Sequence, residues 1–217
     1  MTEPVVALSD YGLTLESAIL AMLTHRRTER TRLREWVVLF FAASAMASLA
    51  GGTVHGFTGN PASRGHRVLW PASLISVGVA GLAGTMIGTI ITFPPRTVTR
   101  VAIAAGAGLG IYSSLAVRGK QRYGIAAAAL LPPTAFLGGV LWQRYRRLRQ
   151  PSVLAGLAGL GVSLLGAGLQ QTRISIRHRF IDHNVIYHLL QGASLILLYR
   201  CFNGLLADSH PDEEGVL

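Results

Sequence analysis

The sequence has few charged residues, and acidic residues are the scarcer kind. Only 14% of its 217 residues are charged, and ten acidic residues stand against twenty basic ones. Half of the residues are hydrophobic, and the mean hydropathy is +0.42. Soluble domains carry about 25% charged residues, so the composition argues against a soluble fold.

Cysteine and lysine each occur once. Cys201 has no second cysteine with which to pair, which excludes an internal disulfide and a cluster of thiolate ligands. The sole lysine, Lys120, lies in a connector between apolar runs, which disfavours a retinal protein. The first apolar run has no basic residues before it and contains Asp10 and Glu16, so we interpret it as a retained helix and not as a signal peptide.

Apolar runs of about 20 residues, the length that crosses the hydrocarbon core of a bilayer, are abundant. We predict an all-α, polytopic membrane protein with a seven-transmembrane-helix bundle over residues 1–207 and an acidic, disordered cytoplasmic tail over residues 208–217. Pro132 and Pro133 should kink the fifth span. The predicted spans are Val5–Thr24, Trp36–Phe57, Val68–Phe93, Val98–Val117, Tyr123–Trp142, Val153–Gln170 and His183–Leu206.

The net charge of +10 is distributed in short arginine-rich clusters between the apolar runs. Membrane proteins keep basic residues in such connectors, so nucleic acid is not an expected partner. If the spans alternate, twelve basic residues lie on the side of the C-terminus and eight on the other side. This bias predicts a protein of the plasma or inner membrane with its N-terminus outside and its C-terminus in the cytoplasm. The twelve are Arg26, Arg27, Arg30, Arg32, Arg34, Arg96, Arg100, Arg144, Arg146, Arg147, Arg149 and Arg200.

A polar stripe marks the last apolar run. Asn184, His188 and Gln191 stand at helix positions i, i+4 and i+7 and therefore share one face. Polar groups are costly in hydrocarbon, so this face should meet protein, and its residues are candidates for function.

Titratable residues gather in the first, second and seventh spans. Alternation of the spans places Asp10, His55, Asp182, His183 and His188 at the same membrane face. Imidazole and carboxylate groups suit zinc, and a site with three protein ligands and a water is the hydrolytic type. We therefore predict His55 and His188 as metal ligands, with His183 as a third if the first turn unwinds. Asp10 or Asp182 would complete the site or act as the base that assists a metal-bound water.

Four further residues are predicted to support this site. Asn184 and Gln191 would orient the ligands or the substrate, and Ser48 and Thr53 lie near His55 in the sequence. A structural explanation stands beside each functional one. Histidines at helix ends are common at the headgroups, and Asp10 and Asp182 could be N-terminal helix caps.

Two segments carry a resemblance to a known family. Gly51-Gly52-Thr53-Val54-His55 and Asn184-Val185-Ile186-Tyr187-His188, at the end of the second span and the start of the seventh, resemble motifs of the superfamily of alkaline ceramidases and progestin/adiponectin-type receptors. The resemblance implies a seven-helix, zinc-dependent lipid amidase fold with a serine four residues before the second-span histidine. It also implies an aspartate downstream and a pair of histidines at i and i+4 in the last span. Gly51 and Asn184 occupy two of these positions here.

Three functions follow from these patterns. The first is a metal-dependent hydrolase of lipid metabolism, acting on a lipid amide or ester near the non-cytoplasmic face. The second is a non-catalytic, receptor-like or small-molecule-binding membrane protein, or a subunit of a larger membrane assembly. The third is a haem protein with His55 and His188 as axial ligands. The expected partners are membrane lipids, a lipid substrate or small ligand, and another membrane protein or a second copy of the chain.

Overall fold

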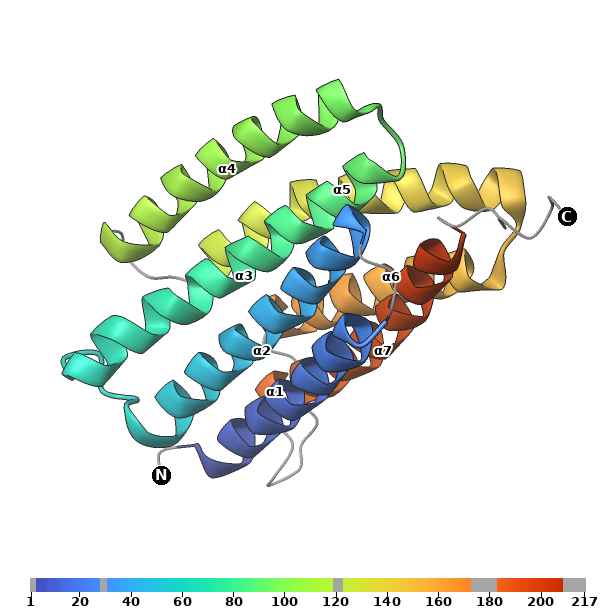
Figure 1. The fold of residues 1–217 in the computed structure, drawn as a ribbon. Helices are drawn as coiled ribbons and strands as arrows, with labels where there is room; N and C mark the ends of the chain where they lie inside the picture. Colours follow the sequence, from blue (N-terminus) through green and yellow to red (C-terminus); the bar gives the residue numbers. More distant parts are fainter. Residues whose placement is uncertain (1–2, 28–30, 119–122, 173–182, 209–217) are drawn as a thin grey trace, which may run out of the picture.

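The chain is all-helical over the residues that the computed structural model describes, which are 3–27, 31–118, 123–172 and 183–208. Seven helices run back and forth along the bundle (Figure 1). Judged on the described residues alone, six of them are long and apolar enough to cross a membrane, and the fifth is not among these six. The helices are α1 (Pro4–His25), α2 (Arg32–Phe57), α3 (Arg64–Ile90), α4 (Pro95–Arg118), α5 (Tyr123–Leu148), α6 (Pro151–Thr172) and α7 (His183–Ala207).

Short polar and proline signals set where several helices begin. The Thr31 side chain accepts a hydrogen bond from the Arg34 amide at 3.2 Å, and the Ser63 side chain accepts one from the His66 amide at 3.1 Å. Both satisfy an amide that the first helical turn would leave unpaired. Proline occupies the first position of α1, α4 and α6, where its missing N–H costs nothing.

Some helices extend beyond the apolar runs that predicted them. Helix α2 begins at Arg32, not at Trp36, and α5 continues past Trp142 to Leu148. Arginine is a good helix former, so the backbone stays helical after the side chains become charged. The capping explanation of Asp10 is wrong, because α1 begins at Pro4 and Asp10 lies buried in its second turn.

Six helices form a closed ring, and α4 lies outside it. The packing runs from α1 to α2, α3, α5, α6 and α7, and α7 returns to α1. Helix α4 packs along the outer side of α3 (Figure 1). Ala116 is its one buried residue. The ring therefore places the first, second and seventh helices next to one another.

The end of the ring at the start of α2 and the end of α7 is solidly packed. Phe41 of α2 and Phe202 of α7 are fully buried and meet edge to face, with ring centroids 6.1 Å apart. Val37, Leu141 and Leu205 belong to the same cluster. This apolar cluster joins the ring helices at one end, whereas the opposite end is hollow.

Helices α6 and α7 approach closely through small residues. A Cβ atom added at Gly156 would lie 2.8 Å from the Cβ of Cys201, so only glycine fits there. The Ser194 hydroxyl of α7 donates a hydrogen bond of 2.8 Å to the carbonyl oxygen of Gly159. Such small-residue contacts and interhelical hydrogen bonds are typical of helix pairs in membranes.

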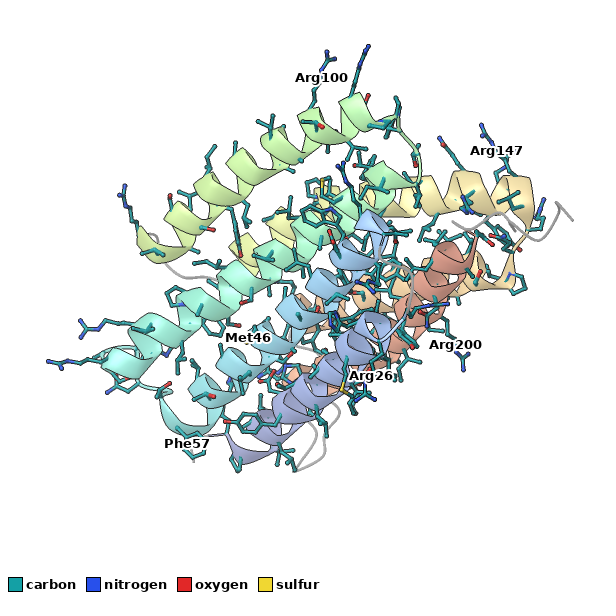
Figure 2. All side chains as sticks on the ribbon, viewed as in Figure 1. Arg26, Met46, Phe57, Arg100, Arg147 and Arg200 are labelled. Carbon is teal, nitrogen blue, oxygen red and sulfur yellow. The ribbon has the colours of Figure 1, made fainter. Side chains whose placement is uncertain are left out.

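The outer surface is apolar along the helices and basic at their ends. Met46, halfway along α2, is 55% exposed. Arg100 and Arg147 extend away from the bundle at the end opposite Phe57 (Figure 2). At the end with Arg147, Arg144 also pairs with Asp208, the first residue of the predicted tail, at 2.9 Å. The rest of that tail lies outside the described residues.

Candidate functional site

The hollow end of the ring contains a cavity of about 270 Å³, lined by residues from all six ring helices. Its lining runs from Asn184 to Leu198 on α7 and from Phe40 to His55 on α2. At 1.5 Å per residue these stretches are about 20 Å long. The cavity is therefore narrow and elongated along the helix axes.

The two ends of the cavity differ in polarity. Asp10, His55, Asn184 and His188 line the end where α1 and α7 begin and α2 finishes. Leucine and phenylalanine side chains line the other end, namely Phe40, Leu137, Leu195 and Leu198. An elongated cavity with one polar and one apolar end matches the shape of an amphiphilic molecule.

His188 connects two neighbouring residues of α1. Its Nδ1 atom lies 2.7 Å from the Ser9 hydroxyl, and its Nε2 atom lies 3.3 Å from the Asp10 carboxyl oxygen Oδ1. The Ser9 hydroxyl donates its proton to the Val6 carbonyl oxygen at 2.8 Å. It therefore accepts from His188, and the network assigns the His188 proton to Nδ1. Asp10 and His188 are 5% and 9% exposed.

Asp10 lies against two glycines of α2. A Cβ added at Gly52 would be 2.8 Å from the Cβ of Asp10, and one added at Gly51 would be 3.7 Å from both Asp10 carboxyl oxygens. These glycines let α1 come close enough for Asp10 to reach His188. The second carboxyl oxygen, Oδ2, is buried and has no hydrogen-bond partner among the residues that the structure describes.

His55 is paired with a residue that the sequence patterns did not single out. Its Nδ1 atom lies 2.5 Å from the Glu3 carboxylate, and the Glu3 amide donates to the His55 carbonyl oxygen at 3.2 Å. The ring also meets Trp70 of α3 edge to face, with centroids 6.3 Å apart. Glu3 precedes the first apolar run, so only its position one turn before the buried face of α1 could have indicated this role.

Two amide side chains of α7 are held by α6. Gln170 donates from Nε2 to Oδ1 of Asn184, and the Ser163 hydroxyl donates to Oε1 of Gln191 at 3.1 Å. All four residues line the cavity. The stripe on α7 thus faces protein, as its spacing predicts. Sequence reasoning missed Gln170 and Ser163, although each is a polar residue within the apolar α6.

Of the other predicted site residues, some line the cavity and others do not. Ser48 lines the cavity. Thr53 lies on the α1 side of α2, where its hydroxyl donates to the Leu49 carbonyl oxygen at 2.8 Å and lies 3.3 Å from the Tyr11 hydroxyl. His183 begins α7 and is not among the lining residues, and Asp182 lies outside the described residues.

The arrangement presents two close metal-ligating groups and not three. Among the described residues, no group of three histidine, cysteine or acidic side chains lies close enough to hold a metal ion. Asp10 and His188 face each other, and His55 is directed toward Glu3. As they are placed, these residues do not form a three-ligand centre.

The fold and the cavity together define a helical bundle that encloses an elongated, polar-ended cavity. The chain belongs to the family of unknown function DUF6962, whose model matches residues 5–207 and so extends from the first turn of α1 to the end of α7. Comparison with curated proteins and with solved structures gave no match. The cavity-lining residues all lie within the matched region.

Proposed function

We propose that this chain is an integral membrane protein whose seven helices all cross the bilayer. Six helices have the length and hydropathy of membrane spans, and α5, with 26 residues, connects two of them within the ring. The arginine clusters favour an N-terminus outside and a C-terminus in the cytoplasm. In this orientation the polar end of the cavity lies near the non-cytoplasmic face.

Within the membrane, the protein binds a small amphiphilic molecule in the cavity and performs no chemistry on it. One observation carries this proposal: the cavity is polarised along its length, and at its polar end lies a buried carboxyl oxygen that has no hydrogen-bond partner among the described residues. An unpaired buried acceptor costs about 1–3 kcal/mol, which a bound molecule would offset. Both nitrogens of His188 are already engaged by the protein, so the imidazole serves to hold Asp10.

The molecule would enter from the hydrocarbon between α5 and α6. Leu131 of α5 and Leu164 of α6 line the cavity, yet they are 54% and 45% exposed. In a bilayer these leucines would face lipid tails. An amphiphile dissolved in the membrane would then reach the cavity without passing through water.

Binding can be measured on the full chain in lipid nanodiscs by scintillation proximity. The probes are tritiated decanol, decylamine and decanoate, which share one chain and differ in headgroup. We expect at least one probe to bind saturably, at one molecule per chain, and to be displaced by its unlabelled form. If all three probes are taken up without saturation, in proportion to their partition into the lipid, the proposed function is wrong.

A matched pair of glycine variants tests where binding occurs. Gly84 lines the cavity, and a Cβ added there would make ordinary contacts with Leu137 at 3.8 Å and Phe40 at 4.0 Å. Gly84→Leu should therefore fill the cavity and remove saturable binding. Gly139 is exposed on α5 and has nothing within 4 Å, so Gly139→Leu should leave binding unchanged. Equal binding in the two variants would place the ligand elsewhere.

A hydrolase remains the second candidate, because Asp10, His55 and His188 line the same cavity. This function requires the metal site that the sequence and the ceramidase-like resemblance predict, and the described residues bring only Asp10 and His188 close together. Metal analysis of the purified protein separates the two functions. Zinc near one per chain, lost in His188→Ala, would support the hydrolase. A Soret band in the visible spectrum would instead support the haem protein.

A further inference from the structure

Two unpartnered acceptors line the cavity. Oδ2 of Asp10 and Oε1 of Gln170 are buried and have no hydrogen-bond partner within the described part of the chain. Asn184, which holds Gln170, lies one turn of α7 from His188, which holds Asp10. The amide oxygen of Gln170 only accepts hydrogen bonds, and the Asp10 oxygen only accepts them when the carboxyl group is ionised. A molecule that satisfies them must therefore bring donors at its polar end.

The charges around the polar end favour a cationic headgroup. Among the residues that the structure describes, no lysine or arginine lines the cavity. Two described histidines line the cavity together with Asp10: His188, whose Nε2 is 3.3 Å from Oδ1 of Asp10, and His55, which is paired with Glu3. A carboxylate or phosphate headgroup would meet the Asp10 carboxyl without a permanent positive charge to balance it. An ammonium group would meet a carboxylate with one oxygen that no described residue engages.

The proton count at Asp10 allows a neutral amine to bind. The Nδ1–H group of His188 donates a hydrogen bond to the Ser9 hydroxyl. A second hydrogen bond, between Nε2 and Asp10, therefore requires one further proton on the His188–Asp10 pair. With it the pair carries no net charge. An amine that enters in its neutral form takes that proton: a new N–H bond forms on the amine, and the O–H or N–H bond of the pair breaks. The resulting ammonium, Asp10 carboxylate and neutral His188 keep the same net charge.

The shape of the cavity limits the rest of the molecule. It has about 270 Å³ of space spread over roughly 20 Å of helix length. This space is narrow, and its far end is lined by Phe40, Leu195 and Leu198. One unbranched chain matches the length of this space.

We infer that the ligand is a single-chain aliphatic amine, held as its ammonium ion by Asp10 and Gln170 with its chain directed toward Leu198. This inference rests on the proposed function and specifies its ligand. Asp10 and Gln170 are then specificity residues: they select the headgroup, while the leucine-lined end accepts the chain.

The three probes used in nanodiscs also test the headgroup. A charge-assisted hydrogen bond is about twice as strong as a neutral one, so decylamine should bind at least about tenfold more tightly than decanol, a difference of about 1.4 kcal/mol. Decanoate should bind more weakly than decanol. If decanol or decanoate binds saturably and decylamine binds no more tightly, the headgroup inference is wrong while the cavity still binds amphiphiles. If no probe binds saturably, the proposed function itself is wrong.

The nearly isosteric variant Asp10→Asn tests whether the Asp10 carboxyl group causes the preference for decylamine. It should retain decanol binding and lose the tenfold preference for decylamine. Gln170→Met removes the other acceptor and should lower the affinity for decylamine severalfold. If Asp10→Asn binds decanol and keeps its full preference for decylamine, Asp10 does not select the headgroup. The order of the three probes on the unaltered protein decides the ligand class even if a variant fails to fold.

Discussion

His188 is the neighbour that allows Asp10 to lie in an apolar bundle. An isolated carboxylate would be expensive in hydrocarbon, but a carboxyl and an imidazole with one shared proton carry no net charge. The 3.3 Å approach of these groups depends on Ser9, whose hydroxyl accepts from the far side of the ring at 2.7 Å. Ser9 therefore orients His188, and His188 in turn orients Asp10.

Removing the Ser9 hydroxyl should destabilise the protein. In Ser9→Ala the Nδ1 proton of His188 loses its acceptor, and we expect the free energy of unfolding to fall by about 1 kcal/mol. Unfolding by a denaturing detergent in mixed micelles measures this change. Ser114→Ala is the matched control, because its hydroxyl is exposed and bonds only to the Gly110 carbonyl oxygen of its own helix. Equal effects of both substitutions would show that Ser9 does not support His188.

At the scale of whole helices, glycines determine how closely α6 and α7 pack. Gly156 and Gly161 lie on the same helix, but Gly156 is in a crowded contact and Gly161 faces open space. A Cβ added at Gly156 would lie 2.8 Å from the Cβ of Cys201. A Cβ added at Gly161 would have no atom within 4 Å. The α6–α7 pair closes the ring, so this spacing also fixes where Ser163 and Gln191 lie in the cavity.

Alanine at these two glycines should therefore have opposite effects. We expect Gly156→Ala to lower the free energy of unfolding by about 1–3 kcal/mol, because the extra methyl group forces the two helices apart. Gly161→Ala should be neutral or stabilising by up to about 1 kcal/mol, since alanine is the better helix former. The same detergent titration measures both. A Gly156→Ala variant as stable as Gly161→Ala would mean that α6 and α7 are not in close contact.

For the molecule as a whole, the proposed topology places successive helix ends on alternating sides of the membrane. In a variant with Cys201→Ala, single cysteines at exposed positions can be labelled with a membrane-impermeant maleimide. Ala62→Cys, between α2 and α3, should react on intact cells. Pro94→Cys, before α4, and Arg147→Cys, near the end of α5, should react only after permeabilisation.

The three positions test different parts of the topology. If Ala62→Cys reacts only after permeabilisation, the protein has the reverse of the proposed orientation. Reaction of Arg147→Cys on the same side as Ala62→Cys would mean that α5 does not cross the membrane. The Arg147 result is the more informative, because α5 is not among the six helices that are long and apolar enough to cross a membrane when only the described residues are considered.

Several features of this protein were determined by the sequence alone. The apolar runs predict all seven helices, because backbone hydrogen bonds within a helix depend only on neighbouring residues. The i, i+4, i+7 spacing likewise predicts that Asn184, His188 and Gln191 share a face. Local periodicity decides both, so no tertiary information was needed.

Only the tertiary structure decided which of the polar residues meet. The sequence treats His55 and His188 as equivalent, yet His55 turns toward Glu3 and His188 toward Ser9 and Asp10. That choice depends on how close α1 comes to α2 at Gly52 and on α1 packing against α7. Packing between segments far apart in the chain sets these distances. The cavity and the Asp10 oxygen that lines it therefore follow from the ring of six helices and not from any one segment.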